Sequence, residues 1–390
     1  MKKSVRDVDV KGKRVLVRAD FNVPLKDEGI VDDSRIRACL PTLTYLIEQG
    51  AHIAVGAHLG RPDGAVNAAL SLAPVAGRLG ELIGKDVALC GDCIGDEVEK
   101  AVSRLEPGEL VLLENTRFHP GEEANDPEFA RRLAAPFDMF VNDAFGTAHR
   151  AHASTEGVAH HLPAVAGLLM LSEIKIIRGL RENPEHPFVL ILGGAKTSSK
   201  LPVLNRLMDR VDHILVGGGT CNTFLVAQGV EIGRSEFEAS CVEAAGNMLA
   251  VAGDKMVLPV DAVVAEDLRD DVETRVVPID AIPKEWRKVD IGPETVQVFA
   301  RHLSKAKTVA WNGPLGFTEV EPYGQGTRLI GTALSKLDAM TVIGGGDTVA
   351  ALRSYGLDGA MSHLSTGGGA FFKLLETDDL PALNVLQDTE

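Results

Sequence analysis

Five glycine-rich segments in the second half of the chain could bring backbone close to a bound ligand. They span residues 193–200, 217–219, 312–314, 344–348 and 365–369, and each follows a short apolar run. Glycine permits close backbone approach, and the carboxyl ends of parallel strands share one edge of a sheet, where ligands bind. A plain turn would explain any one of these segments. Five on one edge favour a long groove, lined by backbone, that accepts a nucleotide.

Lys196 and Lys200 are four residues apart within the first of these segments. If a helix begins after Gly194, both ammonium groups lie on one face near its N-terminus. The free N–H groups and the positive end of the helix dipole also attract phosphate there. The alternative is a pair of solvated lysines with no ligand.

Asp347 follows three glycines at the expected start of another helix. Its simplest role is to cap that helix. A more specific role is contact with Mg²⁺ carried by nucleotide phosphates, because Mg²⁺ is usually held by one or two carboxylates plus phosphate oxygens.

The first half of the chain places arginine, histidine, asparagine and aspartate after its apolar runs, with little glycine. These residues occur in the segments 18–24, 58–62, 115–119 and 143–152, and Arg35 lies in a further polar segment. Arginine forms bidentate contacts with phosphate and carboxylate groups. Any one of these arginines could be a surface ion pair, but their shared edge predicts a site for a small polyanion.

Short β-forming runs separated by 20 or more residues must position both groups of residues. About five occur in each half, beginning with residues 15–17, 53–55 and 87–89 and ending with 308–311 and 340–343. This pattern is typical of parallel strands joined by helices. We expect an α/β protein of two doubly wound parallel-sheet (Rossmann-like) domains. The apolar helical pattern at 168–177 and the break at 183–187 predict a hinge helix at about 166–181 between domains 1–165 and 166–377.

Charge and composition narrow the classes of function. The 390 residues carry a net charge of −15, which disfavours general binding to nucleic acid or to an anionic membrane. Five cysteines are too few for a disulfide scaffold. The N-terminus lacks the apolar region of a signal peptide, and the longest apolar stretch, about ten residues near 162–171, is too short to span a bilayer. We expect a cytoplasmic protein.

Several common motifs are missing or incomplete. The chain has no P-loop sequence, and the segments 217–219 and 344–346 lack the third glycine of a dinucleotide fingerprint. Cys90 and Cys93 form a lone Cys-x-x-Cys, which we interpret as two structural cysteines rather than a zinc site.

The chain closely resembles the phosphoglycerate kinase family. The resemblance rests on motifs that occur in family order from about residue 14 to 376: Arg18-x-Asp20-Phe21-Asn22-Val23-Pro24, His58-Leu59-Gly60-Arg61-Pro62, Asp143-Ala144-Phe145-Gly146, Ala148-His149-Arg150-Ala151-His152, Gly193-Gly194-Ala195-Lys196, Trp311-Asn312-Gly313-Pro314, Gly344-Gly345-Gly346-Asp347-Thr348 and Ser365-Thr366-Gly367-Gly368-Gly369-Ala370. Asp92-Cys93-Ile94-Gly95 also looks like a family segment.

The resemblance implies reversible phosphoryl transfer from 1,3-bisphosphoglycerate to MgADP, giving 3-phosphoglycerate and MgATP after closure over the hinge. It implies a phosphoglycerate site at Asp20, Phe21, Asn22, Arg35, His58, Leu59, Gly60, Arg61, Arg117 and Arg150. It implies nucleotide contacts at Gly194, Lys196, Lys200, Gly217, Gly218, Asn312, Glu319, Gly345, Gly346, Asp347 and Thr348, with Asp347 on Mg²⁺. A monomer is also implied, as is return of residues 378–390 to the first domain.

The implied chemistry needs no general base, because the acceptor in the reverse direction is a carboxylate already ionised at neutral pH. Catalysis then depends on alignment and on cations around the transferring group. Arg35, Lys196, Lys200 and Mg²⁺ would be those cations, helped by N–H groups near Gly346 and Gly369.

Two positions depart from the family pattern. Phe371 and Phe372 follow Ala370, where a small polar residue is usual, and Thr318 stands where an aromatic residue usually precedes Glu319. These departures concern the nucleotide end of the site, where the resemblance assigns Glu319 to the ribose.

Two other classes of function are compatible with parts of the pattern. A non-catalytic binding module on this fold would be favoured if a phosphate-contacting residue were missing, yet Arg35, Lys196, Lys200 and Asp347 are all present. A nicotinamide-dependent dehydrogenase would need the dinucleotide fingerprint that the chain lacks.

Overall fold

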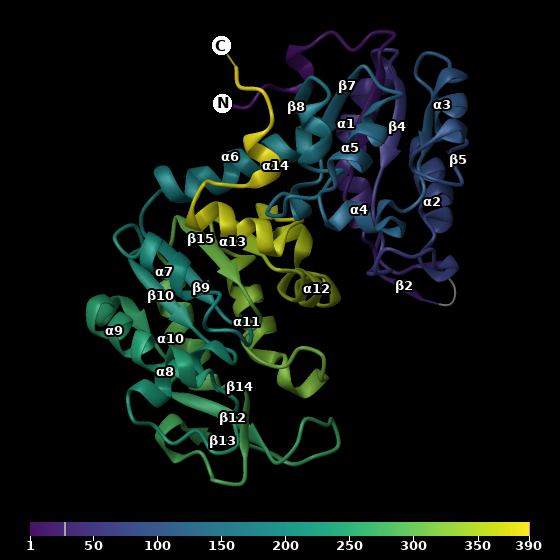
Figure 1. Ribbon diagram of the computed structural model, residues 1–390. Helices are drawn as coiled ribbons and strands as arrows, with labels where there is room; N and C mark the ends of the chain where they lie inside the picture. The colour runs from purple at the N-terminus through teal and green to yellow at the C-terminus, as the bar shows by residue number, and fades with distance from the viewer. Residues whose placement is uncertain (27–28, 390) are drawn as a thin grey trace. The chain divides into compact units, whose positions relative to one another are not determined.

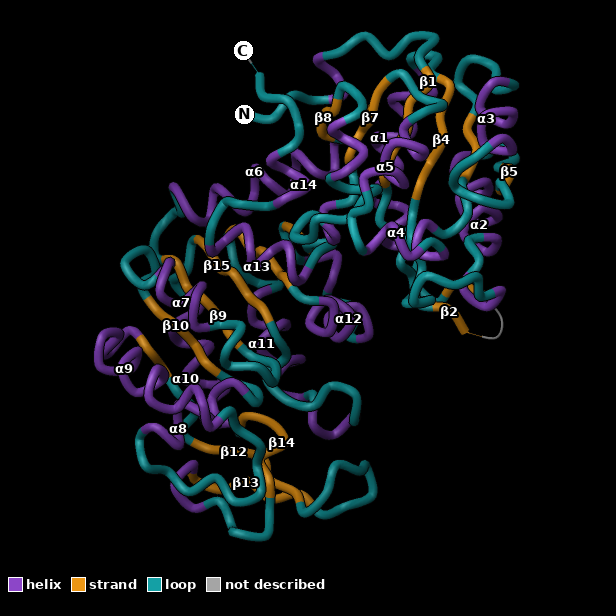
Figure 2. Tube along the Cα trace, in the orientation of Figure 1, coloured by secondary structure: helices purple, strands orange, loops and turns teal. Residues whose placement is uncertain are grey.

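The computed structural model describes residues 1–26 and 29–389. The chain folds into two compact units. Unit 1 comprises Met1–Ile176 together with the segment that begins at Asp378, and unit 2 comprises Ile177–Thr377. Figure 2 shows strands flanked by helices in each unit.

Unit 1 is built on a six-stranded parallel sheet (Figure 1). Its spatial order is β5 (Ala88–Leu89), β6 (Leu110–Leu112), β4 (His52–Gly56), β1 (Arg14–Arg18), β7 (Met139–Asn142) and β8 (Ala164–Ala166). A separate antiparallel pair joins β2 (Leu25–Lys26) to β3 (Gly29–Ile30). The α-helices are α1 (Ser34–Glu48), α2 (Ala73–Ile83), α3 (Asp96–Ser103), α4 (Pro120–Glu123), α5 (Pro127–Ala134) and α14 (Pro381–Asn384). The 3₁₀ helices are η1 (Val5–Asp7), η2 (Ala68–Leu70), η3 (Thr116–Phe118), η4 (Phe145–Thr147) and η5 (Gly157–His160).

Both faces of this sheet are covered, as a parallel sheet requires. Val15 and Val17 of β1 belong to one apolar cluster with Leu43 of α1 and Leu79 of α2. Leu16 points to the opposite face and is also buried. Burial on both faces explains why these strands appear in the sequence as continuous apolar runs.

The C-terminal segment completes unit 1. Leu380 and Leu383 of this segment are fully buried. The backbone N–H of Gln387 donates to the carbonyl of Ala164 in β8 at 2.9 Å, and the N–H of Lys3 donates to the carbonyl of Gln387 at 2.7 Å. Residues from both ends of the chain therefore lie side by side next to β8.

Helix α6 (Leu168–Glu182) contains the boundary between the two units, which falls between residues 176 and 177. The helix expected from the apolar pattern at 168–177 is thus present. Its first turn is held by Asp143, whose Oδ1 accepts hydrogen bonds from the N–H groups of Leu169 (3.0 Å) and Met170 (3.2 Å). Burial raises the pKa of this carboxyl to about 6.

Unit 2 also contains a six-stranded parallel sheet. Its order is β11 (Met256–Val257), β10 (His213–Val216), β9 (Phe188–Leu192), β15 (Thr308–Asn312), β16 (Met340–Gly344) and β17 (His363–Leu364). The α-helices are α7 (Leu201–Leu207), α8 (Thr220–Ala227), α9 (Val242–Ala252), α10 (Pro293–Leu303), α11 (Gln325–Leu334), α12 (Gly346–Ser354) and α13 (Gly368–Glu376). The 3₁₀ helices are η6 (Ala239–Cys241), η7 (Gly253–Lys255), η8 (Ile279–Ala281), η9 (Glu321–Tyr323) and η10 (Asp358–Ala360).

Unit 2 carries a second, antiparallel sheet that the sequence pattern did not predict. Its order is β13 (Thr274–Pro278), β12 (Asp261–Ala265) and β14 (Arg287–Ile291). Ala262, Val264, Ile282 and Trp286 form a small core beneath it. The two-domain doubly wound class is otherwise confirmed, with this sheet as an addition to the second unit.

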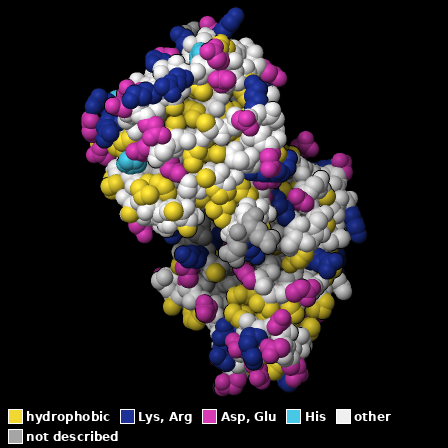
Figure 3. All heavy atoms as spheres, turned by 90° about the vertical axis from the view of Figure 1, so that its right-hand side faces the viewer, with side chains coloured by type: hydrophobic (Ala, Val, Ile, Leu, Met, Phe, Trp, Pro, Cys, Tyr) yellow, Lys and Arg dark blue, Asp and Glu magenta, His cyan; other side chains and the backbone are white. Residues whose placement is uncertain are grey.

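The surface carries both signs of charge. On the face shown in Figure 3, acidic and basic side chains are intermixed. Among the described residues, no helix combines the length and apolar composition needed to cross a membrane.

Candidate functional site

Three neighbouring loops at the carboxyl edge of the unit 1 sheet are tied together around Gly60. The Oδ1 of Asn22, in the loop after β1, accepts a hydrogen bond from the N–H of Gly60 at 2.9 Å. The Nη1 of Arg117, in η3, donates to the carbonyl of Gly60 at 2.9 Å. The Nδ2 of Asn115 donates to the carbonyl of Leu59 at 2.8 Å. The loops after β1, β4 and β6 therefore form one surface, as adjacent parallel strands predict.

Two arginines approach this surface from different elements. Arg35 of α1 donates through Nη1 to the Oδ2 of Asp20 at 2.7 Å. Arg18, at the end of β1, is 1% exposed, and its Nε donates to the hydroxyl of Ser154 at 2.6 Å. The carboxylate of Glu122 lies 3.9 Å from the Arg18 guanidinium.

Histidine 58 lies within this positive field. Its Nδ1 is 3.2 Å from Nη2 of Arg18, and its side chain is buried. Burial is the largest cause that holds the pKa of His58 well below its usual value, and the charges of Arg18, Arg117 and Arg35 lower it further. His58 is therefore neutral at pH 7, and the arginines supply the positive charge for an anion.

Arg61 and Arg150 are exposed at the same edge. Burial lowers the pKa of Arg117, and the positive charges of Arg150 and Arg61 contribute to that lowering, so the three guanidinium groups share one region. The Nε of Arg150 donates to Nε2 of His149 at 3.2 Å. Phe21 and Leu59 are buried and position backbone rather than charge.

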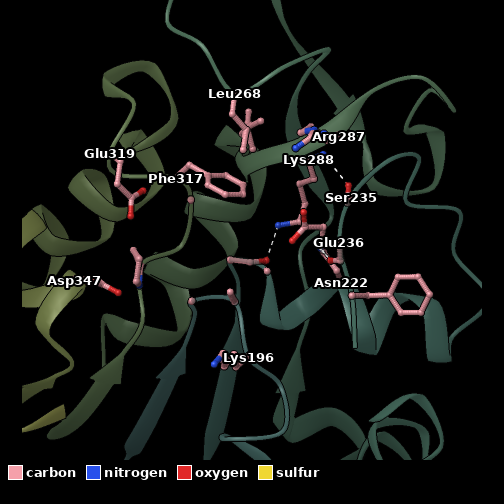
Figure 4. A pocket seen from close by; sticks show the side chains of 18 of the residues that line it. Lys196, Asn222, Ser235, Glu236, Leu268, Arg287, Lys288, Phe317, Glu319 and Asp347 are labelled. Carbon is pink, nitrogen blue, oxygen red and sulfur yellow. Dashed lines mark hydrogen bonds between the residues drawn. The ribbon is translucent and has the colours of Figure 1, made fainter. Parts of the chain in front are cut away.

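Unit 2 contains a cavity of about 550 Å³ at the carboxyl edge of its parallel sheet (Figure 4). Five of the residues predicted to contact a nucleotide line it: Gly194, Lys196, Gly218, Glu319 and Asp347. Lys196 is exposed and lies at one end of the cavity. The glycine-rich loops therefore surround a space of the size that small-molecule ligands occupy.

Glycine is required where these loops meet. A Cβ on Gly313 would lie 2.2 Å from the backbone carbon of Gly193, and Gly313 also has φ +92°. A Cβ on Gly218 would lie 2.6 Å from the carbonyl oxygen of Pro314. Where these glycine loops meet, backbone is consequently packed on backbone.

The remaining predicted nucleotide residues surround the cavity without lining it. The hydroxyl of Thr348 accepts a hydrogen bond from the N–H of Gly313 at 2.8 Å. Gly345 precedes α12, Gly346 begins it, and Gly369 lies in the first turn of α13. Gly217 follows β10 directly. The Nδ2 of Asn312 is buried and has no hydrogen-bond partner among the described residues.

Lys200 is buried beside Asn312. Its Nζ donates to the Oδ1 of Asn312 at 3.0 Å and lies 4.2 Å from the ring centroid of Phe372. Burial lowers the pKa of Lys200 to about 8, while the charge of Asp347 acts in the opposite direction. Phe372, one of the departures from the family pattern, thus directly contacts a predicted phosphate-binding residue.

The prediction of a helix that begins directly after Gly194 is wrong. Residues 193–200 form a loop, and α7 begins at Leu201 with proline in its first turn. The hydroxyl of Thr197 donates to that of Thr223 at 2.8 Å, and the N–H of Ser198 donates to Glu238 at 2.6 Å. These anchors hold the loop open, so Lys196 and Lys200 do not share a helical face.

Asp347 occupies the first turn of α12, as expected, and its side chain is exposed at the cavity. The N-cap of this helix is Gly345, so Asp347 does not occupy the capping position. One exposed carboxylate beside the predicted phosphate-binding residues matches the ligands that Mg²⁺ takes when most of its shell comes from phosphate and water. The residues present therefore fit a magnesium ion that arrives with a nucleotide.

Sequence motifs did not identify all the residues that shape the unit 2 cavity and the carboxyl edge of the unit 1 sheet. Leu268, Lys288 and Phe317 line the cavity, and the first two of these belong to or adjoin the unpredicted antiparallel sheet. Arg18 and Glu122 form the buried charge pair beneath the unit 1 edge. Arg18 is the first residue of a motif in the sequence analysis, but the sequence did not indicate that its side chain is buried.

Comparisons with known proteins agree on one family. The model of the family "Phosphoglycerate kinase" matches residues 5–378. A phosphoglycerate kinase of Pelotomaculum thermopropionicum is 52% identical over 390 residues, covering 99% of each chain, and one of Rubrobacter xylanophilus is 49% identical, covering 100% of this chain and 99% of its own.

Solved structures give the same result. The phosphoglycerate kinase of Coxiella burnetii is 42% identical, covers 99% of this chain and 98% of its own, and has a TM-score of 0.86. That of Pyrococcus horikoshii OT3 is 32% identical, with 98% of each chain covered and a TM-score of 0.88. The family model also matches nearly the whole length of this chain. The chain therefore belongs to the phosphoglycerate kinase family.

Proposed function

We propose that the protein catalyses reversible phosphoryl transfer from 1,3-bisphosphoglycerate to MgADP, giving 3-phosphoglycerate and MgATP. The observation that carries this proposal is the glycine-walled cavity of unit 2, with Lys196 and Asp347 on its lining, in a chain of this family. Kinases of this kind need a nucleotide site and a separate anion site, and each unit supplies one of them.

Unit 2 binds the nucleotide in this proposal. Lys196 and Lys200 hold its phosphates, Gly217 and Gly218 line the base, and Asn312 and Glu319 contact the nucleoside. Gly194, Gly345 and Thr348 support the phosphate end. The buried Nδ2 of Asn312, which has no partner among the described residues, supports this role because such a donor is costly unless a ligand accepts its hydrogen bond.

Unit 1 binds the phosphoglycerate. The contacting residues are Asp20, Asn22, Arg35, His58, Arg61, Arg117 and Arg150, with Phe21, Leu59 and Gly60 as supporting backbone. The concentration of guanidinium groups around a neutral imidazole supports this role, because arginine binds phosphate and carboxylate in bidentate geometry.

The chemical step needs positioned cations rather than a base. A carboxylate acceptor is already ionised at neutral pH, so no side chain must remove a proton. Arg35, Lys196 and Lys200 would neutralise charge on the transferring oxygens, and N–H groups at the starts of α12 (Gly346) and α13 (Gly369) would donate to them. Each well-placed donor is worth about 3 kcal/mol of transition-state stabilisation, by analogy with oxyanion holes.

Asp347 is the residue that would hold Mg²⁺. The ion, when bound, supplies charge neutralisation between neighbouring phosphate oxygens. Because the two substrates are assigned to different units, an in-line transfer also requires the units to close on one another, with α6 as the hinge.

The test is MgATP-dependent phosphorylation of 3-phosphoglycerate, coupled to NADH oxidation by an acyl-phosphate-reducing dehydrogenase. Wild-type protein should turn over, Lys200→Ala should lose most of kcat, and the exposed-lysine control Lys305→Ala should match wild type. An inactive wild-type protein that still folds and binds MgADP would contradict the proposal and indicate a binding protein on a kinase fold.

A further inference from the structure

Lys288 is a buried cation at the wall of the unit 2 cavity. The side chain is 4% exposed, and its Nζ donates to the carbonyl oxygen of Gly218 at 2.6 Å. Figure 4 shows the Lys288 side chain extending from β14 toward the middle of the cavity. The register between β12 and β14 shifts at Val263/Val264, which leaves Val289 as an extra residue on β14. Such a bulge redirects side chains, and Lys288 and Val289 both line the cavity.

The charge of Lys288 has no carboxylate at ion-pair distance. Within residues 1–26 and 29–389, no ion pair within 4.0 Å includes this ammonium. Asp290, on the same strand, uses its carboxylate to accept the N–H groups of Gly326 (2.7 Å) and Ile291 (2.8 Å). The Cys221 thiol is another polar neighbour, and the Lys288 charge lowers its pKa against the larger effect of burial, which raises it. An ammonium has three donors, and a carbonyl and a thiol are weak compensation for burying a charge.

Lys288 lies at the base end of a bound nucleotide, if the cavity holds one as proposed above. Lys196 and Asp347 mark the phosphate end. At the far end from Lys196, Leu268 and Phe317 present apolar surface to the cavity beside Lys288 (Figure 4). Apolar walls suit the faces of a planar base, and a buried donor beside them can address the edge of that base.

We propose that Lys288 determines base selectivity, favouring purine nucleotides with a carbonyl oxygen at position 6, such as hypoxanthine and guanine nucleotides, over adenine nucleotides. An ammonium can only donate hydrogen bonds. A 6-oxo group accepts such a bond, whereas the 6-amino group of adenine is itself a donor. This inference rests on the proposed function, because it assumes that the cavity receives a nucleoside diphosphate.

The test is calorimetric binding of MgADP, MgIDP and MgGDP to the full-length protein, to Lys288→Met and to Lys284→Met. Inosine and adenosine nucleotides differ at position 6 and in the proton on N1, so their ratio of Kd values isolates that edge of the base. Lys284 is exposed and near in sequence, and it receives the same substitution as a matched control.

Wild-type protein should bind MgIDP at least as tightly as MgADP. Lys288→Met should weaken MgIDP relative to MgADP by about tenfold or more, as expected for loss of a hydrogen bond from a charged donor, and Lys284→Met should leave the ratio unchanged. MgGDP should follow MgIDP if the pocket accepts the 2-amino group.

Two results would overturn the inference: tighter binding of MgADP than of MgIDP by wild type, or an unchanged ratio of Kd values in Lys288→Met. An unchanged ratio with weaker binding of both nucleotides would indicate that Lys288 only supports the Gly218 loop. The wild-type ratio decides the question if Lys288→Met does not fold. Selective nucleotide binding without turnover of 3-phosphoglycerate would count against the proposed reaction and not against this inference.

Discussion

Raising the pH should deprotonate Lys200 and slow the enzyme. Lys200 is 7% exposed, donates to Asn312 at 3.0 Å and contacts the ring of Phe372. Burial lowers its pKa to about 8. A lysine whose pKa is lowered keeps its charge below that value and loses it above, so the loss of activity should occur on the alkaline side.

The size of the effect follows from this value. With a pKa of about 8, the ammonium fraction is about 90% at pH 7, about half at pH 8 and about 10% at pH 9. We therefore expect kcat/KM for MgADP to fall about tenfold between pH 7 and pH 9. The decrease at alkaline pH (the alkaline limb of the profile) should be smaller in kcat than in kcat/KM. Bound phosphates favour the charged form of Lys200 and so raise its pKa in the complex.

The assay is initial rate against MgADP concentration from pH 6.5 to 9.5, with the coupling enzymes in excess at every pH. Lys200→Arg is the control, because guanidinium stays protonated across this range. Its rate should be lower but its alkaline limb absent. An identical limb in wild type and Lys200→Arg, or a flat wild-type profile to pH 9.5, would refute the assignment of this charge to the phosphate site.

Three further substitutions test neighbouring parts of the structure. Phe372→Leu removes a cation–π contact to Lys200 that is worth about 1 kcal/mol. The pKa of Lys200 should therefore fall, and the alkaline decrease in kcat/KM should move to lower pH by less than about one unit. Movement to higher pH would be inconsistent with that contact. Arg35→Ala should lower kcat by about 100-fold or more and raise KM for 3-phosphoglycerate much less, and an effect confined to KM would remove Arg35 from the transferring group. Glu122→Gln removes the carboxylate that pairs with the buried Arg18 charge and should reduce the free energy of unfolding by about 3 kcal/mol or more. Urea denaturation of both proteins measures the change, and an unchanged midpoint would show that the pair is not stabilising.

The central parallel strands were predictable because they are buried on both faces. The run at residues 15–17 became β1 and the run at 188–192 became β9 with little change of boundary. The antiparallel sheet was not predictable in the same way, because β13 is largely exposed and is not a continuous apolar run. The start of α7 was misplaced, although Pro202 was an available signal for a first helical turn.

Motifs predicted some residues of the unit 2 cavity and of the unit 1 sheet edge but not others. Lys196, Asp347 and Asn22 stand next to predictable strand ends, so local sequence was enough to bring them into the right neighbourhood. Lys288 reaches the cavity through a bulged strand of the unpredicted sheet, and no spacing in the sequence marks it. Arg18 was visible as a residue, but its pairing with Glu122 joins positions 104 residues apart and depends on tertiary packing.

The return of the C-terminal segment to unit 1 sets an order for folding during synthesis. The first unit lacks Leu380, Leu383 and the strand-like partner of Ala164 until the ribosome has made all of unit 2. At a translation rate of about 5–20 residues per second, the roughly 200 residues of unit 2 impose a delay of about 10 to 40 s. The nascent first unit must therefore persist through the whole synthesis of unit 2 with apolar surface beside β8 uncovered, where chaperones that bind such surface would act.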